Sequence, residues 1–323
     1  MDPRFRQERL NLQRSLYPRA YTFCSLYVPS RCTFLLRQAK ECVMSEQQDK
    51  FQRFKDLHER ESAFVIPNPW DAGSARLLES LGFEALATTS AGYAFSKGKR
   101  DSFAALGREE ILDNAAEIVA AVDLPVSADL EDGFGKAPET CAQTIRLASQ
   151  AGLIGGSIED ATGKPDTPIY DLSLAKERIQ AAAEAAKELP FLLTARAENY
   201  LWGRADLTDT IKRLQAFSEA GADALYAPGL PDLQAIRTVC AEVDKPVNVV
   251  MGLTGPRYTV PELSQAGVCR ISVGGSFARA ALGALKRAAA EVKTYGSFNY
   301  SEDAMPGSEI SKLMIQDKCD ERE

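Results

Sequence analysis

Three carboxylates stand within four positions of the stretch VSADLEDGFG, residues 126–135: Asp129, Glu131 and Asp132. They follow a short apolar run, and Glu159 ends the next apolar run along the chain. So many carboxylates in one cleft cannot all be ionised without a counter-ion or shifted pKa values. Such hard oxygen ligands suit Mg²⁺ or Mn²⁺, which bind a few carboxylates together with waters and substrate oxygens. The alternative is a solvated acidic loop that pairs with nearby arginine or lysine side chains.

The elements that must position these groups repeat one pattern from about residue 62 onward. A short apolar run leads into a turn and then into a stretch whose apolar residues recur three or four apart, as in a helix. The runs span 63–68, 84–90, 124–130, 152–160, 190–198, 222–229, 245–252 and 267–275. Such alternation is typical of a parallel sheet covered by helices. Eight units in about 230 residues predict an α/β fold, a closed (β/α)8 barrel of the TIM type.

Barrel enzymes keep their chemistry at the C-terminal ends of the strands, and polar residues gather at those ends here. The expected set is Asn68, Thr89, Ser90, Asp129, Glu131, Asp132, Glu159, Asp160, Arg196, Glu198, Asn248 and Ser272. The opposite strand ends carry prolines instead, at 125, 190 and 246. An arginine at the end of the strand after Glu159 favours a functional acidic site over a solvated loop.

Five motifs carry a resemblance to the isocitrate lyase/phosphoenolpyruvate mutase superfamily. They are NPWDAGSARLLESLGFEALATTSAGYAFSKGKRD, ADLEDGFG, GGSIED, TARAENYL and RISVGGSFARAAL, within residues 62–293. The resemblance implies a modified (β/α)8 barrel, often with the eighth helix swapped between subunits of a dimer within a tetramer. It also implies Mg²⁺ and a small 2-oxo or 2-hydroxy carboxylate, beside which a C–C or P–C bond is broken or formed.

The resemblance, carried over by position, also implies roles for single residues. Asp129 becomes the carboxylate closest to Mg²⁺, with Glu131 and Glu159 acting directly or through water. Arg196 binds the substrate carboxylate or the developing enolate oxygen. Apart from the resemblance, the position of Glu198 two residues after Arg196 predicts that it holds Arg196 in place or contacts a water on the metal.

Substrate binding falls to other strand ends. The resemblance implies that the backbone N–H groups and hydroxyl of Thr89, Ser90 and Ala91 hold the substrate carboxylate. Asp101 matches an acidic residue near the reaction centre. Asn248 and Ser272, at the ends of later strands, are assigned to the substrate site as well.

The loop after residues 158–160 departs from the superfamily pattern. Isocitrate and methylisocitrate lyases carry a Lys/Arg-Cys-Gly-His stretch there, whereas ATGKPDTPIYD holds neither cysteine nor histidine. Only Lys164 and Thr167 remain of the mutase signature. The leading hypothesis is a Mg²⁺-dependent lyase that cleaves or decarboxylates a small 2-oxo or 2-hydroxy di- or tricarboxylic acid. A mutase or phosphonopyruvate hydrolase is the alternative, and a catalytically silent, metabolite-binding barrel is a third.

Composition excludes other classes of function. The net charge of −7 argues against a general affinity for nucleic acid, and no apolar run is long enough to span a bilayer. Seven scattered cysteines predict free thiols in a reducing compartment. The single histidine, His58, is predicted to lie on a helix surface, which leaves no Ser-His-Asp triad and no His-rich zinc site.

The two ends of the chain differ from the barrel. Residues 1–44 hold eight Arg and Lys against three Asp and Glu, which indicates either a transit segment or a leader before a natural start at Met44. The first reading makes the protein mitochondrial and the second cytoplasmic. We expect a helix over 45–61, the barrel over 62–296 and a loosely ordered or partner-docked tail over 297–323. The alanine-rich stretch from 275 to 296 predicts a homo-oligomer, a tetramer built as a dimer of dimers.

Overall fold

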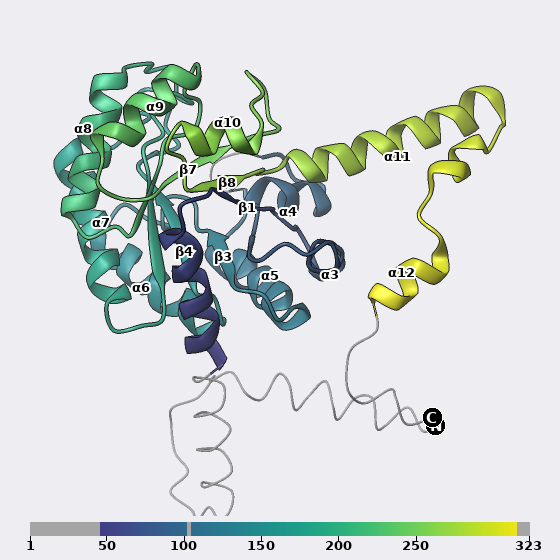
Figure 1. Ribbon diagram of the computed structural model, residues 1–323, viewed down its shortest axis with the longest axis horizontal. Coiled ribbons are helices and arrows are strands. Elements are labelled where there is room, and N and C mark those ends of the chain that lie inside the picture. The colour runs from purple at the N-terminus through teal and green to yellow at the C-terminus, as the bar shows by residue number, and fades with distance from the viewer. Residues whose placement is uncertain (1–45, 102–104, 315–323) are drawn as a thin grey trace, which may run out of the picture. The chain divides into compact units, whose positions relative to one another are not determined.

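A computed structural model of the chain describes residues 46–101 and 105–314 (Figure 1). The expectations for residues 1–44 and for the end of the tail, 315–323, lie outside the described residues. Within them, the alternation of strand and helix follows the chain as the sequence predicted.

Eight parallel strands form one sheet in the order β1-β8-β7-β6-β5-β4-β3-β2. Their bounds are β1 Phe64–Ile66, β2 Leu86–Ala87, β3 Val126–Asp129, β4 Gly155–Glu159, β5 Leu192–Arg196, β6 Ala224–Tyr226, β7 Val247–Val250 and β8 Arg270–Ser272. The N–H of Ala87 donates to the carbonyl of Pro67 at 3.0 Å, so β2 returns beside the end of β1. The predicted barrel is confirmed as a nearly closed one, and each strand lies inside one of the expected apolar runs.

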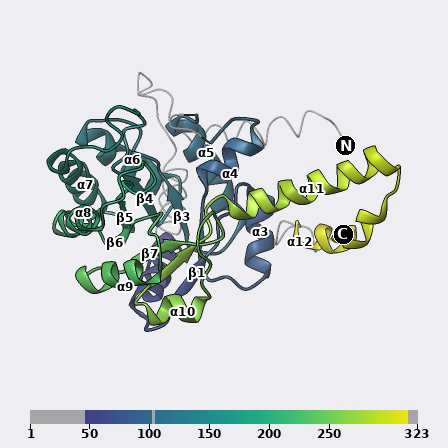
Figure 2. The ribbon, with the colours of Figure 1, turned by 90° about the horizontal axis from the view of Figure 1, so that it is seen from above.

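Helices follow the strands, and all but the last of these, α11, lie around the barrel, whereas α11 projects away from it (Figures 1 and 2). They are α3 Ala72–Ser80, α4 Ser90–Ser96, α5 Arg108–Ala121, α6 Pro138–Gln150, α7 Leu172–Ala186, α8 Leu207–Glu219, α9 Leu233–Glu242, α10 Val260–Gln265 and α11 Ser276–Tyr295. Side-chain caps mark several starts: Asp71, Asp206, Asp232 and Thr259 each accept a hydrogen bond from the backbone N–H three residues on. Each cap satisfies a donor that the helix itself leaves unpaired.

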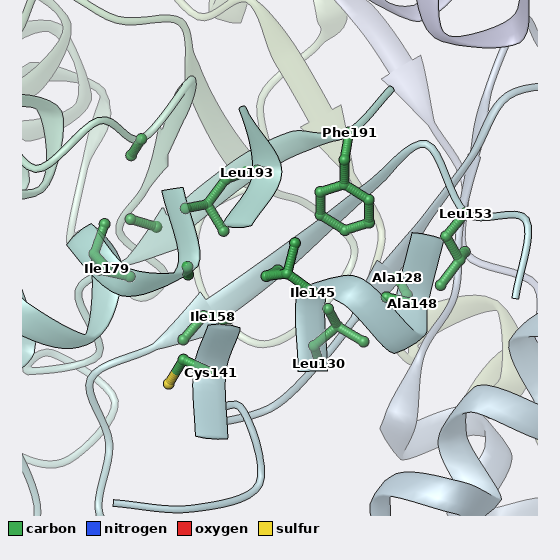
Figure 3. Packing of buried hydrophobic residues seen from close by; sticks show 14 of the residues in the cluster. Ala128, Leu130, Cys141, Ile145, Ala148, Leu153, Ile158, Ile179, Phe191 and Leu193 are labelled. Carbon is green, nitrogen blue, oxygen red and sulfur yellow. The ribbon is translucent and has the colours of Figure 1, made fainter. Parts of the chain in front are cut away.

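The main hydrophobic core lies between the strands and the helices outside them. Figure 3 shows Ile145 of α6 among side chains of β4 and β5, including Ile158 and Leu193, and all three are fully buried. Truncating such a side chain to alanine removes about 2–5 kcal/mol from the free energy of unfolding. This packing fixes the strands whose ends carry the acidic groups.

A helix over residues 46–59 packs against the N-terminal ends of the strands. Its buried face includes Phe54 and His58, and the imidazole lies 4.6 Å from the Phe54 ring and 5.0 Å from that of Phe64, centroid to centroid. The prediction that His58 lies on a helix surface is therefore wrong. His58 lies four residues after Phe54, so it shares the face of the helix that packs against the barrel, while most of the charged residues lie on the exposed face.

The last long helix, α11, is largely uncovered. Ala278 is its one buried residue, and Leu282 and Leu285 are 47% and 65% exposed. The chain then passes through η1 (Asn299–Asp303) to α12 (Gly307–Leu313), which contacts α3 (Figure 1). This part of the predicted loose tail is helical. No helix of the described residues, α11 included, has the length and apolarity needed to cross a membrane.

Candidate active site

A cavity of about 840 Å³ opens at the C-terminal ends of the strands. Every residue that the sequence singled out for catalysis, substrate or metal lines it, namely Thr89, Ser90, Ala91, Asp101, Asp129, Glu131, Glu159, Arg196, Glu198, Asn248 and Ser272. These residues come from six different strands or the segments that follow them. Only the closed barrel brings them together, as its geometry predicts.

Arg196 is the centre of the acidic part of this cavity. Its Nη1 lies 2.9 Å from Asp129 Oδ1, and its Nη2 lies 3.2 Å from Glu159 Oε2. Nε donates to Glu198 Oε1 at 2.9 Å. Burial lowers the pKa of Arg196, but the charges of Glu198, Glu159 and Asp129 outweigh it and raise that pKa well above the usual value. The guanidinium is thus a permanent cation held by three carboxylates.

The single positive charge of Arg196 does not balance all the carboxylates around it. Burial, followed by the charge of Asp129, raises the pKa of Glu131 to about 7 and also raises the pKa of Asp101. Burial, followed by the charge of Glu198, raises the pKa of Glu159 well above its ordinary value. These shifts have the cause that the sequence indicated, which is several carboxylates crowded into a poorly solvated cleft.

The turn after β3 directs Asp132 away from the cavity that Asp129 and Glu131 line. Glu131 and Phe134 have φ of 51° and 62°, a left-handed conformation that is uncommon for residues other than glycine. Asp132 consequently points away from the cavity, accepts hydrogen bonds from the N–H of Phe134 and the hydroxyl of Tyr170, and lines a neighbouring cavity instead. The expectation that Asp132 shares the cleft with the other acids is wrong.

Asp160 supports the site from outside the cavity. Its Oδ1 accepts the backbone N–H of Glu198 at 2.8 Å, and its Oδ2 lies 3.1 Å from Nη1 of Arg213. Burial raises the pKa of Asp160 to about 6. The aspartate therefore fixes the backbone that carries Glu198, which in turn holds Arg196.

The start of α4 forms another wall. Thr89 caps the helix by accepting from the N–H of Gly92 at 3.2 Å. The N–H groups of a first helical turn have no partner within the helix, so those of Ser90 and Ala91 are suited to a ligand carboxylate. Ser90 Oγ donates to Asp129 Oδ2 at 2.8 Å and thereby links this wall to the acidic group.

The wall formed by β7 and β8 contains polar residues that the sequence analysis did not single out. Asn248 Nδ2 donates to Ser272 Oγ at 3.1 Å, and both were predicted. Arg270 of β8, which was not, also lines the cavity, as does Tyr226 at the end of β6, the strand adjacent to β7. Arg270 stands two residues before Ser272, a spacing that places both side chains on the same face of a strand.

The residues fit a divalent cation by their donor chemistry. Asp129, Glu131 and Glu159 offer hard oxygen ligands at the mouth of the barrel, and their site holds more acidic than basic groups. In the described part of the chain no three acidic, histidine or cysteine side chains are already grouped as a ligand set. Arg196 accounts for this, because its guanidinium lies between Asp129 and Glu159.

The loop between β4 and α7 forms a compact hairpin, closed by a bridge between Ala161 and Ile169. Gly163 and Pro165 line the site cavity, whereas Lys164 and Thr167 line the neighbouring one. The loop therefore contributes no ionisable side chain to the site. The described cysteines, Cys141, Cys240 and Cys269, are free thiols outside the cavity, as predicted.

A nearly closed (β/α)8 barrel with an arginine among carboxylates at its C-terminal face defines a class of enzyme, and comparisons with known proteins identify the family. The model of the phosphoenolpyruvate phosphomutase family matches residues 54–293, so the chain belongs to that family. The predicted superfamily is confirmed, and the chain is a lyase- or mutase-type member of it.

Three relatives illustrate the likeness. A candidate lyase/mutase from Burkholderia cenocepacia J2315 is 57% identical, with a TM-score of 0.82 over 84% of this chain and 98% of that one. The 2-methylisocitrate lyase of Bacillus subtilis is 28% identical over 78% of this chain and 85% of its own length. Oxaloacetate decarboxylase 1 of Pseudomonas putida is 27% identical over 71% of this chain and 79% of its own.

Proposed function

We propose that the chain is a Mg²⁺-dependent lyase that breaks a C–C bond beside the carbonyl or carboxylate of a small 2-oxo or 2-hydroxy di- or tricarboxylic acid. The observation that carries the proposal is the contact of Arg196 with Asp129, Glu159 and Glu198 inside one cavity. Asp129, Glu131 and Glu159 would hold the cation. When bound, Mg²⁺ supplies Lewis-acid stabilisation of the negative charge that develops on the substrate.

Arg196 has the geometry to stabilise an enolate. Glu198 holds Nε from one side and Asp129 holds Nη1, so the planar guanidinium is oriented before the substrate arrives. Such preorganised charge favours the transition state over the ground state, because the enolate oxygen becomes negative only as the bond breaks. The N–H groups of Ser90 and Ala91 would receive the substrate carboxylate.

Two features support cleavage or decarboxylation of a carboxylic acid. The β4–α7 hairpin contributes no acid or base to the cavity. Loss of CO₂ from a 2-oxo diacid such as oxaloacetate, whose departing carboxylate is β to the carbonyl, leaves an enolate and needs less proton transfer than aldol-type cleavage does. The relatives include a 2-methylisocitrate lyase and an oxaloacetate decarboxylase, whose names both denote C–C bond breakage in small carboxylic acids.

A substrate panel tests the proposal. Oxaloacetate, substituted malates and methylisocitrate are each incubated with the protein, with Mg²⁺, with Mn²⁺ and with a chelator, and pyruvate, glyoxylate and CO₂ are assayed. The proposal expects turnover of at least one compound that stops on chelation. Metal-independent turnover, or none of any di- or tricarboxylate, contradicts it.

The phosphonate chemistry of the family is the second candidate. The match to the phosphomutase model over residues 54–293 favours it, as does the presence of Lys164 and Thr167 in the β4–α7 hairpin. However, both residues line the neighbouring cavity and not the site cavity, which counts against phosphonate chemistry. Phosphonopyruvate in the same panel, followed by phosphorus NMR, separates the two. Binding of these ligands without turnover would indicate the silent barrel.

We also propose that the protein works as a homo-oligomer, a tetramer of two dimers, in the cytoplasm. The uncovered apolar side chains of α11 support a second copy as its partner: Phe277, Leu282 and Leu285 are all more than a third exposed on one helix. Leaving such a surface in water is costly, since burial of apolar area contributes about 25 cal/mol per Å².

A further inference from the structure

Arg270 is a buried cation without an acidic partner. The side chain lies inside the barrel and is 5% exposed, and its three hydrogen-bond partners are neutral. Nε donates to Asn248 Oδ1 at 2.9 Å, Nη2 donates to Thr194 Oγ1 at 2.9 Å, and Nη1 lies 3.1 Å from His58 Nε2. Among the described residues no carboxylate lies within ion-pair distance of Arg270, in contrast to Arg196, which has three such neighbours.

An arrangement of this kind is unfavourable for the empty protein. Burial lowers the pKa of Arg270 to about 10, which still leaves the group charged at neutral pH. A buried charge that is hydrogen-bonded but not paired keeps a large part of its desolvation cost. The cost falls if an anion enters the cavity that Arg270 lines.

The cavity is therefore electrically asymmetric. Its β3–β5 side carries Asp129 and Glu159 together with Arg196, whose positive charge is already paired with these carboxylates. This side therefore suits a cation. Its β7–β8 side carries Arg270 beneath Asn248 and Ser272, which suits an anion. A ligand with a chelating end and a second carboxylate matches both sides, whereas a monocarboxylate matches only one.

The contacts around Arg270 also orient the group that would receive this carboxylate. Because Arg270 Nε donates to Asn248 Oδ1, the amide must direct Nδ2 toward Ser272. His58 holds the guanidinium from the opposite side. Its Nδ1 lies 2.8 Å from the carbonyl of Phe54 and must donate to it, which leaves Nε2 as the acceptor for Arg270.

We propose that Arg270 is a specificity-determining residue that provides the counter-charge for the second carboxylate of a dianionic substrate and positions Asn248 to bind it. The inference rests on the proposed function for the substrate class and adds to it the part of the cavity that distinguishes dicarboxylates from monocarboxylates. It also gives the helix over 46–59 a role in the site, through His58.

The test compares two 2-hydroxy acids that differ by one carboxylate, L-malate and L-lactate. Their binding to the full chain with Mg²⁺ is measured by calorimetry for the wild type, Arg270→Met, Arg270→Lys and His58→Gln. Lys136→Met is the matched control, because it removes one positive charge from an exposed residue outside this cavity.

The wild type is expected to bind malate at least tenfold more tightly than lactate. Arg270→Met should lose most of this preference by weakening malate alone, Arg270→Lys should keep part of it, and His58→Gln should reduce it less than Arg270→Met does. The control should behave as the wild type. If Arg270→Met fails to fold, the malate preference of Arg270→Lys and His58→Gln is compared with that of the wild type instead.

The inference is overturned if the wild type does not prefer malate, or if the Arg270 variants weaken both ligands equally. The latter outcome would make Arg270 a structural residue only. Failure of the proposed function looks different, because a retained malate preference without turnover of any di- or tricarboxylate contradicts that function and leaves the inference standing.

Discussion

Arg196 and Asp129 are 67 residues apart in the sequence, and their side chains meet at 2.9 Å across strand β4. The contact joins the arginine proposed to stabilise the enolate to the carboxylate proposed to lie nearest the metal. Any change to one of them alters the electrostatic environment of the other. Arg196 also contacts Glu159, which sits on the strand between them.

Replacing Arg196 by lysine tests the enolate role. Lysine keeps the charge but loses the planar fork, which at present contacts Asp129, Glu159 and Glu198 at once. We expect kcat for the substrate found in the panel to fall on the order of tenfold or more, with a smaller change in KM, since the lost interaction is strongest in the transition state. Steady-state kinetics at saturating Mg²⁺ measure both. An unchanged kcat would remove Arg196 from the chemistry.

Metal binding should appear as thermal stabilisation. A cation that binds only the folded chain adds about 1.4 kcal/mol at ten times its Kd, which raises Tm by a few degrees for a domain of this size. Asp129→Asn should abolish the increment. Asp132→Asn, in the same turn but facing the neighbouring cavity, should keep it. Differential scanning fluorimetry over a Mg²⁺ titration decides, and equal increments in both variants would refute the assignment.

The strand ends could be predicted from the sequence because a parallel barrel imposes two simple patterns. Its strands are continuous apolar runs, and its polar groups collect where these runs end. Glu159 and Arg196 illustrate the point, since both are the last residues of their strands and pair in register. No knowledge of side-chain geometry was needed to bring them together.

Residues that depend on side-chain direction could not be predicted in this way. Arg270 lies within an apolar run, and only the strand register, which pairs it with Asn248, shows that its side chain reaches that residue. Asp132 and Glu131 are adjacent carboxylates in the sequence, and only the left-handed turn directs the Asp132 side chain away from the site cavity. His58 stands among charged residues, and its burial follows from the docking of its helix under the barrel.

The apolar side chains of α11 predict association. Leu282→Glu together with Leu285→Glu should dissociate the assembly, because two charges would have to be buried in the interface. Light scattering at micromolar concentration should report a tetramer for the wild type and a smaller species for the variant. Lys286→Glu, a charge change on a residue that is exposed and already polar, is the control. A wild-type monomer contradicts the prediction.

His58 should make the stability of the protein depend on pH in a defined direction. Burial, followed by the charge of Arg270, lowers its pKa from 6.5 to about 3. Between these pH values the unfolded chain binds more protons than the folded one. The contribution of this group to the free energy of unfolding therefore rises with pH across the window and is lost on acidification. Relative to pH 7, the loss from this group at pH 4 is about 3 kcal/mol.

His58→Gln isolates this effect, because glutamine does not titrate. Buried acids such as Asp160, whose pKa is raised to about 6 by burial, act in the opposite direction, but they are present in both proteins and cancel in the difference. We expect urea unfolding to show the variant less stable than the wild type at pH 7, where the neutral imidazole accepts from Arg270, with the gap narrowing steadily toward pH 4. Arg270 and the carbonyl of Phe54 are the groups that face the imidazole, and neither changes its charge over this range. Parallel pH profiles of the two proteins would mean that His58 is not held neutral by the Arg270 contact.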